Sequence, residues 1–167
     1  STNPTTGCWN ESIFNVLAHS NEFNINIADS NVLDLYSGVG SFGLECISRE
    51  AKFVTFIEKN RLALDMLKKN LNDLSLNNQA QVISSTIENF LKLKQIKKYK
   101  ILFFDPPFAD NEFIQNLKII REIKIFERDH IIIIHRERKT ENNFDNILHI
   151  IKKKEYGRSE IFFAKFI

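Results

Sequence analysis

With 167 residues, 43% of them hydrophobic, the chain has the length of about one domain and enough apolar material for a single core. No apolar run is long enough to span a bilayer, and the net charge of +2 does not indicate a strongly basic nucleic-acid binder. The two cysteines, Cys8 and Cys46, are too few for a disulfide framework or a metal-ligand cluster, so we expect a cytoplasmic protein with no metal site and no membrane contact.

Short apolar runs alternate along the chain with longer amphipathic ones. In chain order, we predict a helix at 9–20, a strand at 31–36, a helix at 41–50, a strand at 52–58, a helix at 61–74, a strand at 80–85, a helix at 86–93, a strand at 100–105, a helix at 111–120, a strand at 130–135 and β-like runs at 146–156 and 159–167. Strands that alternate with helices form a mostly parallel sheet covered on both faces. Gly157 between the last two runs predicts a closing antiparallel hairpin.

No linker or repeat divides the sequence. We therefore predict a single domain over 1–167, with an N-terminal segment and helix at 1–20 and a Rossmann-like α/β core at 31–167. In an open sheet of this class, ligands bind at the carboxyl ends of the strands, so the residues that follow each strand are the candidates for a site.

A glycine-rich loop follows the first predicted strand. Gly38, Gly40 and Gly43 have the G-x-G-x-x-G spacing of a dinucleotide site, and Glu58 ends the second strand 20 residues after Gly38. A carboxylate at that position can accept hydrogen bonds from both hydroxyls of a ribose. Taken alone, this pattern fits several nucleotide cofactors, NAD among them.

Asp34, at the end of the first strand, argues against NAD because a carboxylate beside the glycine loop would repel a diphosphate. It suits a ligand with a cationic end, such as S-adenosylmethionine, which carries a sulfonium and an amino acid. In the alternative interpretation, Asp34 only caps the loop and Gly40 only eases the packing of helix on strand. The predicted cofactor site comprises Asp34, Tyr36, Gly38, Gly40, Glu58, Lys59, Thr86 and Ile87.

The stretch ILFFDPPF (101–108) ends the fourth strand on a rigid corner. That strand neighbours the first one in a switch-point sheet, so the corner should face the cofactor loop. The Asp105 carboxylate and the Pro106 carbonyl can accept the two N–H bonds of an amine and leave its lone pair aimed at a methyl donor. Pro107 keeps the corner rigid, and Phe108 offers a face for a stacked base. An isolated Asp-Pro-Pro is often only a turn, but its order after Asp34 and Glu58 favours a catalytic site.

The sequence resembles the RsmD-type RNA methyltransferases, which act on the exocyclic amine of a guanine in bacterial small-subunit (16S) ribosomal RNA. The similar stretches are PTT with NESIFNVL (4–17), VLDLYSGVGSFGLECISR (32–49), FIEKN (56–60), FFDPPF (103–108) and YGRS (156–159). The resemblance implies a class I methyltransferase fold, in which Gly38, Gly40 and Glu58 bind S-adenosylmethionine and 105–108 hold the guanine. It also implies ribosomal RNA as the partner, either free or in a small-subunit assembly intermediate.

The chain departs from the family pattern at four positions. Asn3, Gly7 and Asn10 stand where the family usually has an arginine, an aspartate and a basic residue. Thr86 stands where an acid or amide often contacts the adenine. These departures leave open how the N-terminal segment contributes to RNA binding.

The basic residues after the fifth and sixth strands are candidates for phosphate contacts. Arg136, Arg138 and Lys139 follow the fifth strand, and Arg158 lies in the turn after the sixth, so we predict that these four bind RNA. The basic run at 92–100 precedes the fourth strand and should lie at the opposite edge of the sheet, as solvated surface.

Three other functions fit parts of the pattern. A DNA or protein-amide N-methyltransferase would use the same corner, since similar corners also hold adenine and glutamine nitrogens. A non-catalytic RNA-binding or assembly factor could retain the fold, and a nicotinamide enzyme could use the glycine loop. We expect a monomer.

Overall fold

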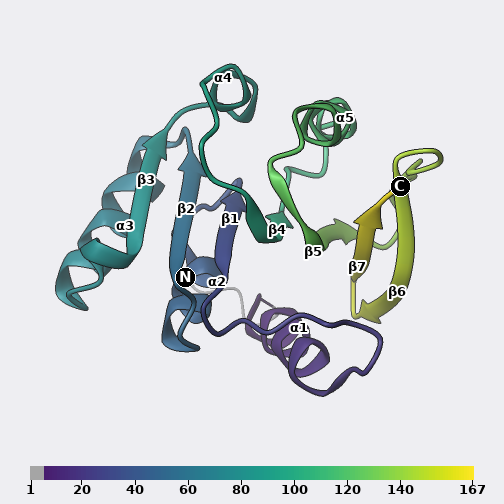
Figure 1. Cartoon of the computed structure of the whole chain (residues 1–167), viewed down its shortest axis with the longest axis horizontal. Coiled ribbons are helices and arrows are strands. Elements are labelled where there is room, and N and C mark those ends of the chain that lie inside the picture. The colour runs from purple at the N-terminus through teal and green to yellow at the C-terminus, as the bar shows by residue number, and fades with distance from the viewer. Residues whose placement is uncertain (1–5) are drawn as a thin grey trace.

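The computed structural model describes residues 6–167, with side chains from Trp9 onward, so the predicted contributions of Asn3, Pro4 and Thr5 lie outside the described residues. Figure 1 shows one sheet with helices on both of its faces. The helices are α1 (Thr6–His19), α2 (Ser41–Ser48), α3 (Arg61–Asp73), α4 (Ile87–Leu91) and α5 (Phe113–Ile123), with a 3₁₀ turn at Asn77–Gln79. The strands are β1 (Asn31–Leu35), β2 (Phe53–Glu58), β3 (Ala80–Ser84), β4 (Tyr99–Phe104), β5 (Phe126–Glu137), β6 (Leu148–Tyr156) and β7 (Ser159–Phe166).

The seven strands follow the order β3-β2-β1-β4-β5-β7-β6. Neighbouring strands from β3 to β5 are parallel, whereas β7 runs antiparallel to both β5 and β6. The predicted fold class is therefore confirmed, including the closing hairpin and the contact between β1 and β4. Because β6 and β5 flank the same antiparallel strand, β6 points in the same direction as β5. The turn after β6 thus emerges at the carboxyl edge of the sheet.

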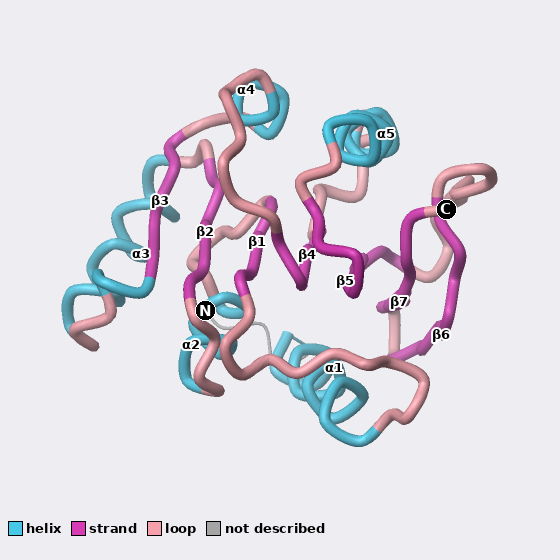
Figure 2. Tube along the Cα trace, viewed as in Figure 1, coloured by secondary structure: helices cyan, strands magenta, loops and turns pink. Residues whose placement is uncertain are grey.

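Two apolar layers cover the sheet, as the strand period of two requires. Side chains of α1, α2 and α3 pack on one face against residues such as Val32, Phe103 and Ile133. Side chains of α4 and α5 pack on the other face against residues such as Leu33 and Phe104. Figures 1 and 2 show α4 and α5 on one side of the strands and α1 and α2 on the other.

Strand β5 is longer than predicted, because it runs from Phe126 to Glu137 and not from 130 to 135. Phe126 pairs with Tyr99 before a shift in register, and its ring lies 4.6 Å from that of Phe166. The first part of the strand was not predicted because residues 127–129 are polar and the sequence becomes strongly apolar only at Ile131.

Candidate active site

The carboxyl ends of β1, β2, β3 and β4 surround a hollow of about 630 Å³. Seven predicted site residues line it: Tyr36, Glu58, Lys59, Thr86, Ile87, Asp105 and Pro107. Its charged lining comprises the carboxylates Glu58, Glu88, Asp105, Asp110 and Glu112 and the ammonium of Lys59. The excess of negative charge favours a cationic ligand and disfavours a diphosphate.

Glu58 organises the two loops that border this hollow. Its Oε1 accepts a hydrogen bond from the amide of Gly38 at 2.8 Å, and its Oε2 accepts from the amides of Lys59 and Asn60 at 2.8 and 2.9 Å. A carboxylate has about four acceptor positions, so one on Oε1 is left for a ligand hydroxyl. Gly38 has a φ of +57°, and apart from its two chain neighbours no residue has a heavy atom within 4 Å of the place where a Cβ would be, so a ligand can approach the backbone there.

Asp34 lies beneath the same loop and is almost fully buried. Its Oδ2 accepts a hydrogen bond from the amide of Gly43 at 3.0 Å, whereas its Oδ1 is buried without a partner. Burial raises the pKa of Asp34 well above its ordinary value; the bond from Gly43 opposes this rise, and the carboxylates of Asp105 and Glu58 add to it. A buried carboxylate with one unpaired oxygen lowers the stability of the fold unless a cation or a hydrogen-bond donor contacts that oxygen.

The alternative interpretation of this loop agrees with part of the geometry. Asp34 does accept from an amide in the first turn of α2, and a Cβ on Gly40 would lie 2.4 Å from Cδ1 of Leu67. Gly40 therefore allows close packing against α3 as well as a turn with φ +86°. Capping does not explain why Oδ1 of Asp34 is buried without a hydrogen-bond partner. The Oγ of Ser37 is buried without a partner as well.

Asn116 on α5 joins the loop after β1 to α4, and the sequence pattern did not single it out. Its buried Nδ2 donates to the hydroxyl of Tyr36 at 3.2 Å and to Oε1 of Glu88 at 3.0 Å. The bond from Asn116 lowers the pKa of Glu88, and burial raises the pKa of Tyr36. Thr86 lies beside them as the N-cap of α4, since its Oγ1 accepts from the amide of Asn89 at 3.1 Å.

The Asp-Pro-Pro-Phe corner follows β4 at the same edge. The side chain of Asp105 is 34% exposed, Pro106 is buried, and Phe108 is 51% exposed. Oδ1 of Asp105 lies 2.8 Å from Nδ1 of His135, a residue that no sequence motif indicated. Its position just after an apolar run, where it prolongs β5 to the carboxyl edge, was the signal that could have found it.

The prediction that Arg136 contacts RNA is not supported, because its side chain is buried. Its side chain is 1% exposed, because it lies on the α5 face of β5 with its guanidinium 4.6 Å from the ring of Phe113. It donates to the carbonyls of Pro107 and Phe108, both at 3.3 Å, and to Oδ1 of Asn142 at 3.0 Å. Arg136 thus holds the backbone of the corner, and its guanidinium is not available to a phosphate.

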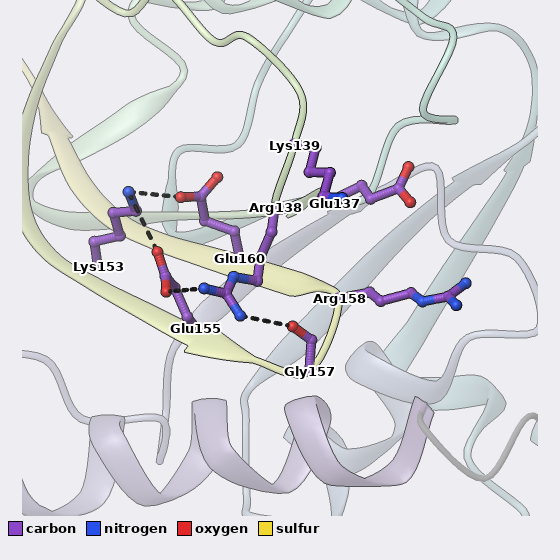
Figure 3. Close-up of a pocket in the computed structure, with 8 residues that line it drawn as sticks. All are labelled: Glu137, Arg138, Lys139, Lys153, Glu155, Gly157, Arg158 and Glu160. Carbon is purple, nitrogen blue, oxygen red and sulfur yellow. Dashed lines mark hydrogen bonds and ion pairs between the residues drawn. The ribbon is translucent and has the colours of Figure 1, made fainter.

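The other three predicted RNA contacts do lie together at the carboxyl edge. The amide of Arg138 donates to the carbonyl of Arg158 at 2.8 Å, which joins the end of β5 to the β6–β7 turn. These residues and Lys139 line a second hollow of about 660 Å³ (Figure 3). The guanidinium of Arg138 lies 2.8 Å from a carboxylate oxygen of Glu155, whereas Arg158 extends away from that ion pair.

The basic run at 92–100 lies at the opposite edge, as predicted. Nζ of Lys97 is 3.3 Å from the ring centroid of Phe53, at the start of β2, and Lys100 forms an ion pair with Glu127. Over residues 6–167, no cluster of three potential metal ligands occurs. No helix in that range has both the length and the hydropathy needed to cross a membrane.

Residues 1–165 match the family model described as conserved hypothetical protein 95. A relative named ribosomal RNA small subunit methyltransferase D, from Buchnera aphidicola subsp. Baizongia pistaciae, is 33% identical over 164 residues, which cover 98% of this chain and 80% of the relative. The Escherichia coli K12 protein of the same name is 35% identical over 119 residues, covering 71% of this chain and 56% of its own length. The solved structure of Escherichia coli yhhF, described provisionally as a methyltransferase, has a TM-score of 0.82 and 28% identity over 98% of this chain and 86% of that one. The chain therefore belongs to the conserved hypothetical protein 95 family, which is the RsmD family of methyltransferases.

Proposed function

We propose that this protein uses S-adenosylmethionine to methylate the exocyclic amine of a guanine in small-subunit ribosomal RNA. The proposal is carried by two features of the carboxyl edge: an acidic hollow lined by Glu58 and Asp105, and the unpaired buried oxygen of Asp34 on β1, the strand next to β4. Relatives named ribosomal RNA small subunit methyltransferase D support the reaction and the substrate class.

The residues around the hollow fit S-adenosylmethionine better than a nicotinamide dinucleotide. When bound, this cofactor supplies an electrophilic methyl group. Asp34 and the neighbouring carboxylates would stabilise its positive charge, and the remaining acceptor position of Glu58 would bind its ribose. A pyrophosphate would meet the same carboxylates with repulsion, which argues against the nicotinamide alternative.

The corner has the groups needed to orient an aromatic amine. Oδ1 of Asp105 is bound by His135, and no donor among the described residues contacts its Oδ2, so Oδ2 can accept an N–H of the substrate. The carbonyl of Pro106 can accept the other N–H. The half-exposed ring of Phe108 offers a stacking surface for a base that has been turned out of folded RNA.

The RNA would cross the carboxyl edge beside this corner. Arg138, Lys139 and Arg158 are exposed there and could contact the phosphates that flank the guanine, whether the RNA is free or part of an assembly intermediate. The monomeric state and the single-domain organisation remain predictions.

Methylation of small-subunit ribosomal RNA from a strain that lacks this protein tests the proposal, with the product mapped by mass spectrometry. We expect one N2-methylguanine.

Variants of the corner test the mechanism. Asp105→Ala should abolish most of the single-turnover rate and leave cofactor affinity nearly unchanged. Phe108→Ala should weaken RNA binding by about 1–3 kcal/mol, the usual contribution of base stacking. Asp73→Ala, at an exposed ion pair on α3, is the control. A methyl group found only on DNA or on a protein amide would refute the substrate, and an unchanged rate for Asp105→Ala would refute the mechanism.

A further inference from the structure

Three side chains, from β5, β7 and the residue that follows β4, form a series of hydrogen bonds that ends at the proposed catalytic carboxylate. Nδ1 of His135 lies 2.8 Å from Oδ1 of Asp105, and Nε2 of His135 lies 2.8 Å from Oγ of Ser159. The side chain of His135 is 8% exposed, whereas that of Asp105 is 34% exposed. A nearly buried ring therefore contacts a partly exposed carboxylate.

The strand register places these groups next to one another. Phe104 of β4 pairs with Ile134 of β5, so the following positions on the two parallel strands are Asp105 and His135. On the other side, β7 runs antiparallel to β5 and begins at Ser159, opposite Glu137. The contact thus depends on the pairing of three strands, which fixes the positions of His135 and Ser159 and of Asp105, the first residue after β4.

Aromatic packing restricts the plane of the imidazole. The ring of His135 stacks on that of Trp9, with centroids 4.3 Å apart and planes 10° apart. The ring of Phe108 meets it edge-on at 6.4 Å. Trp9 is itself buried and stacks on Phe103, so rotation of the imidazole would disturb the core beneath it.

Hydrogen-bond chemistry determines which group donates in each of these two hydrogen bonds. An ionised carboxylate only accepts, so the bond to Asp105 requires a proton on Nδ1 of His135. In the neutral imidazole, Nε2 is then an acceptor and receives the hydroxyl proton of Ser159. Ser159 therefore donates to His135, and His135 donates to Asp105. Oδ1 of Asp105 is occupied, and Oδ2 is left for the substrate.

We propose that His135 is a positioning residue for methyl transfer: it holds Asp105 in the rotamer that presents Oδ2 to the acceptor amine, and Ser159 holds His135 in the tautomer that this requires. The inference rests on the proposed function, because it assigns the amine contact to Asp105. Without His135, a partly exposed carboxylate would sample several rotamers. Small displacements at a reacting centre cost up to about a hundredfold in rate.

A pair of substitutions separates this role from simple packing. His135→Leu removes the hydrogen-bond donor to Asp105. His135→Asn retains a donor, because its side-chain amide N–H lies near the position of Nδ1. We expect His135→Leu to lower the single-turnover rate of methyl transfer about 10- to 100-fold with S-adenosylmethionine affinity within about twofold of the parent. His135→Asn should recover most of the rate. Equal losses of rate in both variants, in proportion to their loss of Tm, would reduce His135 to a packing residue and overturn the proposal.

Ser159→Ala tests the outer bond with little change in packing. It should lower the rate by less than His135→Leu does, and it should shift the tautomer of His135. Nitrogen NMR of the imidazole reports that tautomer without any assay of function: we expect a proton on Nδ1 in the parent and a mixture of tautomers in Ser159→Ala. A parent protein protonated on Nε2 alone would overturn the proposal. Failure of the parent to methylate ribosomal RNA would instead refute the proposed function, and the NMR result would still decide whether the chain of hydrogen bonds exists.

Discussion

Removal of the Glu58 carboxylate should weaken cofactor binding through two separate effects. Glu58→Ala deletes the acceptor that we assign to the ribose, and it releases the amides of Gly38, Lys59 and Asn60. A hydrogen bond to a charged group contributes about 1.5–3 kcal/mol, which corresponds to a loss of affinity of about ten- to a hundredfold. The amides of Lys59 and Asn60 are exposed and can bind water instead, so their release should cost little.

The amide of Gly38 is less accessible, so its release should destabilise the cofactor-free protein. A cost of about 1 kcal/mol lowers Tm by about 2–4 °C in a protein of this size. Glu58→Gln is the informative companion, because its single side-chain oxygen can accept either from Gly38 or from the pair Lys59 and Asn60, but not from both. Its Tm and its affinity should lie between those of the parent and Glu58→Ala.

Isothermal titration calorimetry should use both S-adenosylmethionine and its demethylated product. The ribose hydroxyls are identical in the two ligands, so Glu58→Ala should weaken both by the same factor. Glu45→Ala, at an exposed ion pair with Arg49 on α2, is the matched control and should leave both affinities unchanged. A lower Tm for Glu58→Ala with unchanged affinity for both ligands would show that Glu58 only holds the loops.

Two further predictions concern charge. Burial raises the pKa of Asp34, so the folded state binds a proton that the unfolded state has released, and stability falls as the pH rises above about 4 toward the folded pKa. In the absence of cofactor, the Tm of Asp34→Asn relative to the parent should therefore increase with pH over this window, while its cofactor affinity falls; a relative Tm that decreases with pH would contradict the reasoning. Lys139→Ala/Arg158→Ala should flatten the log–log salt dependence of RNA affinity by about 0.7–0.9 for each phosphate that is no longer bound. The control Lys94→Ala/Lys98→Ala should leave the salt dependence of RNA affinity unchanged. A flatter slope in the control pair alone would show that the RNA binds at the opposite edge.

The sequence by itself determined the order of the elements and the edge at which the site lies. The apolar periods are local, so they predicted six of the strands closely and the closing hairpin at Gly157. Parallel strands bring their carboxyl ends to one edge, which is why Glu58 and Asp105 could be assigned to one hollow although they are far apart in the chain. The glycine loop could also be predicted from the sequence. Its backbone has φ values of +57° and +86° at Gly38 and Gly40, which favour glycine, so the conformation is reflected in the residue type.

Only the tertiary structure decided what each side chain near that edge contacts. In the run HRERK, the sequence shows one basic patch, but strand alternation turns His135 toward Trp9 and Arg136 toward Phe113. Because α5 covers the second of these faces, Arg136 is buried against the corner while Arg138, two residues later, is exposed. The bond between His135 and Asp105 likewise depends on the register of β4 and β5, which no local pattern contains, since register is a property of two strands and not of either one.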